Sequence, residues 1–171
     1  SPDQVQRRLL AAGQRPVSNI VDVSNYVMLE LGKPIHTFDA AAVHDGRIIV
    51  RLARPGERLE TLDHVERELD PETLLIADPR GVLGIAGVMG GENSEISDST
   101  VDVVIESACW DPISIRRTAK RLGISSDASQ RFERGVDPER VRYALDRAAQ
   151  LIQELAGGTV LQGVVDVYPH K

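Results

Sequence analysis

Cysteine, positive charge and long apolar runs are scarce in this sequence, and each shortage excludes a class of protein. Cys109 is the sole cysteine of 171 residues, which rules out an intramolecular disulfide, and no group of Cys and His has the spacing of a structural zinc site. No segment approaches the roughly 18 apolar residues that span a bilayer, and no signal peptide is recognisable. We therefore expect a reducing, cytoplasmic setting with no membrane partner and no metal site.

The balance of charge is acidic, with 20 Lys and Arg against 26 Asp and Glu and a formal net charge of −6. General nucleic-acid coat proteins instead carry a broad basic surface that displaces counterions from phosphate. Any contact with RNA must therefore be local. One basic run, from Arg116 to Arg121, has helical spacing and can meet phosphates or simply face solvent. The chain opens on Ser1 rather than Met, so we expect it to be part of a longer protein.

Hydrophobic periodicity and turn residues predict an α+β fold for residues 1–171, as a single compact domain with a mixed, mainly antiparallel sheet packed with helices. Helices are expected after a capping box at Ser1–Gln4, along the apolar stripe from Val17 to Leu31, and after the N-cap and proline pairs at 111–112 and 137–138. Strands are expected over 47–53, in a hairpin through 58–69, and over 73–79, 81–91, 101–110 and 159–168.

Glu106 interrupts an expected strand, VDVVIESACW (101–110), that has apolar residues on both faces. A carboxylate there is at least partly buried, and an unpaired buried charge costs several kcal/mol and raises the pKa of the group. Glu106 therefore needs a partner. That partner is either one of the arginines of this chain, in a structural ion pair, or a ligand.

Two further positions break the pattern around the end of the second expected helix. Ser24 places a hydroxyl in the apolar stripe, where it can bond back to a carbonyl of its own helix or serve a site. His36 follows Pro34 in the segment KPIHTFD (33–39), and the proline restricts the backbone that carries the imidazole. A loop histidine of this kind is either a structural residue or a proton-transfer group.

Glycines recur in GVLGIAGVMGG (81–91), at 84, 87, 90 and 91. They permit positive φ or a close approach of backbone N–H groups to a ligand. No Gly-Lys-Ser/Thr follows, so the segment is not a P-loop. The segments SSDAS (125–129) and RFERGVDP (131–138) are expected to form turns and caps between the last two helices.

Four segments have long and specific wording, namely RPVSNIVDVSNYVMLELGKPIHTFD (15–39), AGVMGG (86–91), ESACWDP (106–112) and RLGISSDASQRFERGVDP (121–138). Together and in this order they resemble one family, the central editing domain of the bacterial phenylalanyl-tRNA synthetase β subunit. The resemblance implies hydrolysis of tyrosine wrongly attached to tRNA(Phe). It implies a pocket with catalytic positions at His36, Ser24 and Ser126 and with substrate-binding positions at Glu106, Gly87, Pro34 and Ala128. Glu106 would recognise the tyrosine phenol.

The same resemblance implies the partners, which are the tRNA(Phe) acceptor end and the synthetase α subunit in a heterotetramer of two α and two β chains. No cofactor is expected in this segment, while ATP and magnesium belong to aminoacylation by the whole synthetase. Ser24 and Ser126 stand where the family has threonine, and His64 stands where a turn glycine is more typical. Two alternatives remain open, a non-catalytic module that positions tRNA or the α subunit, and an unrelated small-ester hydrolase.

Overall fold

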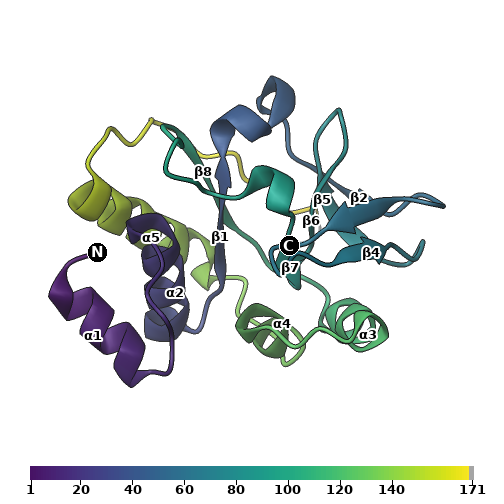
Figure 1. Ribbon diagram of the computed structural model, residues 1–171, viewed down its shortest axis with the longest axis horizontal. Helices are drawn as coiled ribbons and strands as arrows, with labels where there is room; N and C mark the ends of the chain where they lie inside the picture. Colours follow the sequence, from purple (N-terminus) through teal and green to yellow (C-terminus); the bar gives the residue numbers. More distant parts are fainter. Residues whose placement is uncertain (170–171) are drawn as a thin grey trace.

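The computed structural model describes residues 1–169 and places strands β1 and β8 between a helical side and a sheet side of the molecule (Figure 1). Helices α1, α2 and α5 lie on one side, and β2 to β7 lie on the other together with α3 and α4. The helices are α1 (Asp3–Ala11), α2 (Asn19–Leu31), α3 (Pro112–Leu122), α4 (Asp127–Phe132) and α5 (Arg140–Ala156). The strands are β1 (Ile35–Asp39), β2 (Ile49–Leu52), β3 (Arg58–Glu60), β4 (Glu66–Glu68), β5 (Leu74–Ala77), β6 (Val82–Ile85), β7 (Met89–Gly90) and β8 (Val103–Ser107).

Strand pairing within residues 1–169 is antiparallel throughout and divides into three small sheets, β1-β8, β2-β5-β6-β7 and β3-β4. The prediction of an α+β domain with mainly antiparallel strands is therefore confirmed. The expected hairpin through 58–69 is the β3–β4 pair. Its turn holds His64 at a φ of 58°, a left-handed conformation that glycine adopts more easily.

The helical side is held together by α2 and α5, which pack on each other and on the β1–β8 pair. Ser18 caps α2 by accepting a hydrogen bond from the Val21 N–H at 3.3 Å, and Gly32 ends the helix at a φ of 68°. The buried apolar residues of this cluster are Val23, Val27, Ile35, Ala144, Ala148 and Leu151.

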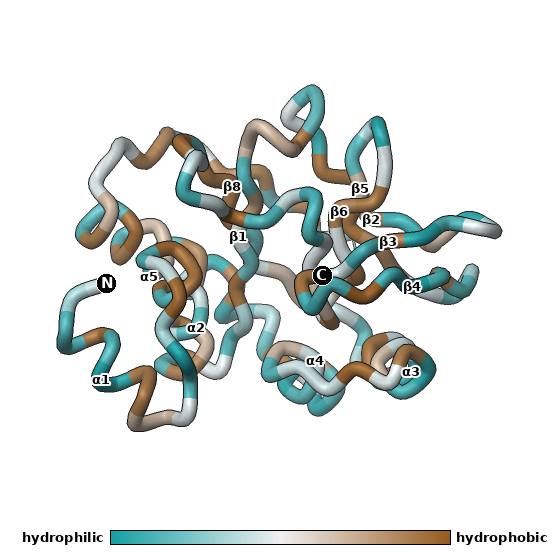
Figure 2. The backbone as a smooth tube through the Cα atoms, viewed as in Figure 1, coloured by the Kyte–Doolittle hydropathy of each residue, from teal (hydrophilic) through white to brown (hydrophobic). Residues whose placement is uncertain are grey.

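The sheet side has a second core between the strands and helices α3 and α4. Figure 2 shows the apolar segments gathered inside and hydrophilic residues at the outer turns. Phe38 on β1 packs with Val43, Ile76, Leu83 and Ala86, and it thereby joins β1 to the four-stranded sheet. The main cluster consists of Ala53, Leu59, Leu69, Leu75, Val82, Ile85, Val88, Ile115, Ile124 and Phe132.

Two expected helix starts are wrong. Helix α1 begins after Pro2 with no side-chain cap, so Ser1 and Gln4 form no capping box. Helix α5 begins at Arg140, because Asp137 and Pro138 form a separate turn in which the Asp137 carboxylate accepts from the Glu139 N–H at 3.0 Å. Asp111, in contrast, caps α3 as expected.

Three other segments also differ from their prediction. The stretch expected as a polar loop, 125–129, contains the first turn of α4, and Val17 precedes α2 rather than starting it. Residues 159–168 form no strand in the structure and pair with none of β1 to β8, and Leu161 and Val165 are 84% and 95% exposed. Between residues 1 and 169, no helix combines the length and apolar character that crossing a bilayer requires.

Candidate active site

The site is built on one rung of the β1–β8 pair, where His36 lies directly opposite Glu106. Directly opposed residues of antiparallel strands share a face, with Cβ atoms about 4.5–5.5 Å apart. The register therefore brings together the two sequence positions that were singled out independently. It also turns both side chains toward the same space.

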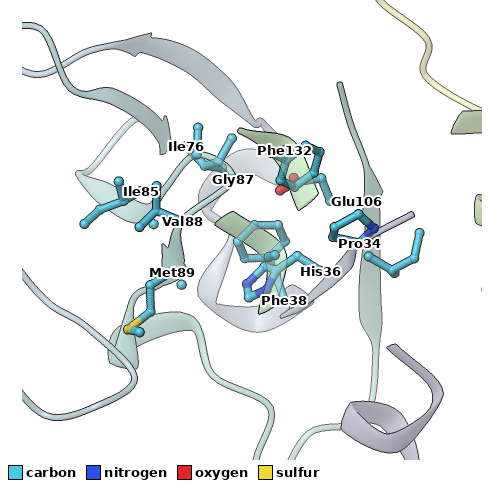
Figure 3. A pocket seen from close by; sticks show the side chains of 15 residues that line it. Pro34, His36, Phe38, Ile76, Ile85, Gly87, Val88, Met89, Glu106 and Phe132 are labelled. Atoms are coloured by element: carbon cyan, nitrogen blue, oxygen red, sulfur yellow. The ribbon is translucent and has the colours of Figure 1, made fainter. Parts of the chain in front are cut away.

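That space is a cavity between the β1–β8 pair, the β6–β7 region and α4 (Figure 3). Its empty volume is about 470 Å³, counting the part open to solvent. Five of the seven predicted site residues line it, namely Pro34, His36, Gly87, Glu106 and Ala128. The other lining residues are Ile35, Phe38, Ile76, Gly84, Ile85, Ala86, Val88, Met89, Gly90 and Phe132.

Glu106 has no arginine partner among residues 1–169, so the alternative of a structural ion pair is not realised. Burial raises the pKa of its carboxyl group to about 7, and the positive charge of Lys33 acts in the opposite direction. Within the described chain, no donor hydrogen-bonds to this carboxylate, so it can accept a hydrogen bond from a ligand in the cavity.

His36 is held between an aromatic ring and a bare backbone. Its ring meets Phe38 edge to face, with centroids 4.5 Å apart. Gly90 also lies against the ring, and a Cβ added there would fall 2.7 Å from the imidazole Cε1. Burial lowers the pKa of His36 to about 4, so the ring is neutral at pH 7 and keeps a lone pair that can accept a proton.

Gly87 is required by its surroundings and by its backbone. A Cβ there would lie 2.6 Å from Trp110 and 2.9 Å from Ile115, and the residue has a φ of 66°. Trp110 therefore fills the space that the missing side chain leaves. What Gly87 presents to the cavity is its main chain, and Ala86 and Val88 line the cavity on either side of it.

Ser24 and Ser126 do not line the cavity. The Ser24 hydroxyl donates to the carbonyl of Ile20 at 3.3 Å, which is the bond back to its own helix that the sequence left open. Ser126 is the N-cap of α4. Its hydroxyl accepts from the Ser129 N–H at 3.0 Å and donates to the Val88 carbonyl at 2.7 Å, so it ties α4 to the glycine-rich segment.

Two residues at the cavity, Phe132 and Lys33, were not singled out from the sequence, and the contact of Gly90 with His36 was not foreseen. Phe132 forms its wall on α4, Gly90 makes room for His36, and Lys33 lies buried behind the wall. The spacing of the glycines indicated the region of Gly90 but did not indicate that His36 packs against it. The local signal for Lys33 was its place directly before Pro34, because a residue that precedes proline is restricted to extended backbone conformations.

Metal chemistry has no candidate ligand set in the described part of the chain, where no three His, Cys, Asp or Glu side chains come together. The lining residues also include no Ser, Thr, Cys or Lys. The cavity can therefore offer an imidazole, a carboxylate and main-chain groups. These groups can orient and polarise a bound water or ester, but none of them is a typical covalent nucleophile.

Fold and cavity together define a small α+β domain with a cavity built on paired strands. The B3/4 domain family matches residues 1–157, and the chain belongs to that family. Its relatives carry the name phenylalanine–tRNA ligase beta subunit. The protein from Symbiobacterium thermophilum is 57% identical over 169 residues, which are 99% of this chain and 19% of that protein.

Two further relatives have the same name. The protein from Dehalococcoides mccartyi is 53% identical over 171 residues, covering 100% of this chain and 21% of the relative. That of Corynebacterium glutamicum is 56% identical over 163 residues, covering 95% of this chain and 19% of the relative. The chain thus spans about a fifth of the length of the curated relatives it matches.

Proposed function

We propose that this chain is the editing domain of a phenylalanine–tRNA ligase beta subunit and hydrolyses the ester of tyrosine on tRNA(Phe). The observation that carries the proposal is Glu106, a carboxylate that lines the cavity opposite His36 and has no partner among residues 1–169. The family and the relatives' names supply the context of a synthetase. The tRNA acceptor end and the α subunit are the proposed partners, in the cytoplasm, and ATP and magnesium serve the rest of the synthetase.

Selection of tyrosine follows from the need for a hydroxyl group. A synthetic pocket shaped for phenylalanine rejects one added hydroxyl only about a hundredfold, whereas a pocket that hydrogen-bonds the hydroxyl discriminates by about 10⁴ or more. Glu106 accepts from the phenol when tyrosine enters. Phenylalanine leaves the same carboxylate desolvated and unpaired, which costs about 1–3 kcal/mol or more. The correct product is protected by that penalty.

Hydrolysis uses water, because no lining side chain is a covalent nucleophile. Water adds to the ester carbonyl, the bond to the ribose oxygen breaks, and the products are free tyrosine and the terminal hydroxyl of the tRNA. His36 orients this water through its neutral imidazole, and the neighbouring ribose hydroxyl shares the proton transfer. Gly87 and Pro34 fix the main chain around the amino acid. Ser126 positions α4, on which Ala128 lies.

The test measures deacylation of Tyr-tRNA(Phe) and Phe-tRNA(Phe) by the intact synthetase and by two variants. Glu106→Gln keeps the shape of the side chain and removes its charge, so the preference for the tyrosyl ester should fall at least about tenfold. His36→Ala should slow hydrolysis of both esters. Glu95→Gln, at an exposed position, is the matched control and should change neither rate.

Two results would overturn the proposal. A wild-type enzyme that leaves Tyr-tRNA(Phe) intact would make the domain a non-catalytic module that positions tRNA or the α subunit. An unchanged preference for tyrosine in Glu106→Gln would remove Glu106 from recognition even where hydrolysis persists.

A further inference from the structure

Lys33 is fully buried, with a relative exposure of 0%, and has no carboxylate within ion-pair distance in the described chain. Its ammonium group donates to the carbonyl of Ala108 and lies 5.5 Å from the centroid of the Phe132 ring. Lysines are almost never buried without a partner, because a desolvated ammonium is costly. Lys33 is therefore a charge whose burial is unfavourable. The residues that it contacts all lie at or near the cavity.

The residues that Lys33 contacts either line the cavity or lie close in sequence to a residue that lines it. Pro34, its chain neighbour, lines the cavity. Ala108 lies two residues past Glu106 and directly follows the last residue of β8. Phe132 on α4 forms the opposite wall. Lys33 itself does not line the cavity, so a substrate would not touch it.

Among the charged groups around Glu106, Lys33 is the one whose positive charge acts to lower the pKa of its carboxyl group. From β1, His36 faces Glu106 and is neutral at pH 7, while Asp39 pairs with the far end of β8. From α5, Arg140 donates to the carbonyl of Leu31. Lys33 in turn has a pKa lowered by burial, against which Cys109, Glu106 and Asp137 act.

We propose that Lys33 is a positioning residue of the cavity, whose ammonium group ties the end of β8 to the α4 wall and keeps Glu106 able to act as a hydrogen-bond acceptor. The cation over the Phe132 ring and the bond to the Ala108 carbonyl fix the two walls relative to each other. Its charge favours the ionised form of Glu106. The role in substrate selection rests on the proposed function, whereas the effect on Glu106 does not.

The first experiment follows the Glu106 carboxyl by carbon-13 NMR in the glutamate-labelled chain, with Glu106→Gln used to assign the signal. In Lys33→Met the titration midpoint of Glu106 should move up by about one pH unit, because the opposing charge is gone. Lys33→Arg, which retains the charge, should restore the wild-type midpoint. Lys120→Met makes the same substitution at an exposed site on α3 and should leave the midpoint unchanged.

The second experiment measures the ratio of tyrosyl to phenylalanyl ester hydrolysis against pH in the intact synthetase. In wild type the ratio should rise as Glu106 ionises near pH 7, and in Lys33→Met the rise should move to higher pH by the same amount. A moved NMR midpoint with no wild-type hydrolysis would uphold Lys33 and reject the editing function. An unmoved midpoint in a folded Lys33→Met would reject the role of Lys33 alone.

Lys33→Gln is a second neutral variant that keeps a donor for the Ala108 carbonyl. It should fold, with a Glu106 midpoint raised as in Lys33→Met. If both neutral variants fail to fold while Lys33→Arg folds, Lys33 serves stability only, and the proposal is overturned.

Discussion

His36 and Glu106 should give the stability of this protein two opposite responses to pH. The folded-state pKa of His36 is about 4 against an ordinary 6.5, so the folded chain binds fewer protons between these values and gains stability as pH rises. The pKa of Glu106 is about 7 against an ordinary 4.5, so its stabilising contribution is present below pH 4.5 and is lost as pH rises to 7. The two trends oppose each other over nearly the same range.

Single variants should separate these trends. Relative to wild type, Glu106→Gln should gain unfolding free energy as pH rises from 4.5 to 7, by up to about 3 kcal/mol. His36→Gln should be favoured over wild type at pH 4 and lose that advantage by pH 6.5. Urea unfolding at half-unit steps of pH measures both. Variants whose profiles run parallel to wild type would show that neither group is perturbed.

A substitution at Gly90 tests whether this glycine is needed for the space that it leaves to His36 or for the flexibility of its backbone. A methyl group there would displace the His36 ring, so Gly90→Ala should lower hydrolysis of the tyrosyl ester by about tenfold or more and destabilise the fold by about 1–3 kcal/mol. Gly81→Ala is the matched control, because a Cβ at 81 has nothing within 4 Å. Steady-state deacylation and thermal unfolding measure the two effects. Equal behaviour of the two variants would contradict the steric role of Gly90.

At the scale of elements, helix α4 depends on Ser126. Ser126→Ala removes the cap and the bond to the Val88 carbonyl, so the free energy of unfolding should fall by about 1–2 kcal/mol. Ser126→Thr keeps the hydroxyl and should remain near wild type. Ser125→Ala changes an exposed neighbour that caps no helix and is the control. If the Ser126→Ala protein has unchanged stability, the capping role is rejected, and a catalytic role of the hydroxyl becomes the better explanation.

Elements whose signals lie within their own segment could be predicted from sequence. Elements that form only through contacts with another segment could not. Asp111 before Pro112 started α3 as expected, because cap and proline act within one turn. Asp137 before Pro138 carried the same signal, but its carboxylate closed a turn first. The apolar alternation of 159–168 has the propensity of a strand, yet a strand also needs a neighbour. The pairing of His36 with Glu106 required register, which the two segments do not encode separately.

At the scale of the whole molecule, the segment after α5 should be dispensable for folding. Residues 159–169 are exposed and lie outside all three buried clusters. A chain ending at Gly158 should therefore unfold within about 0.5 kcal/mol of the full chain in urea. A larger loss would mean that the tail stabilises the fold through contacts outside those clusters.

Part of the cavity lining was predictable from sequence motifs, but the shape of the cavity was not. Pro34, His36, Gly87, Glu106 and Ala128 were named from motifs, and all five line it. Ser24 and Ser126 carry the right chemical group but are turned to carbonyls of Ile20 and Val88. A hydroxyl that donates within its own fold cannot be distinguished in sequence from one that faces a ligand. Only the fold decides between them.

The shared rung of β1 and β8 also constrains how related genes can change in length. Codons added or lost between the two strands leave His36 opposite Glu106, but a single codon gained inside 35–39 or 103–107 turns one of the pair to the far face. Gaps among descendants of a common ancestor should therefore gather in the connecting loops. A natural chain that carries a gap within either strand and still deacylates the tyrosyl ester would break this rule.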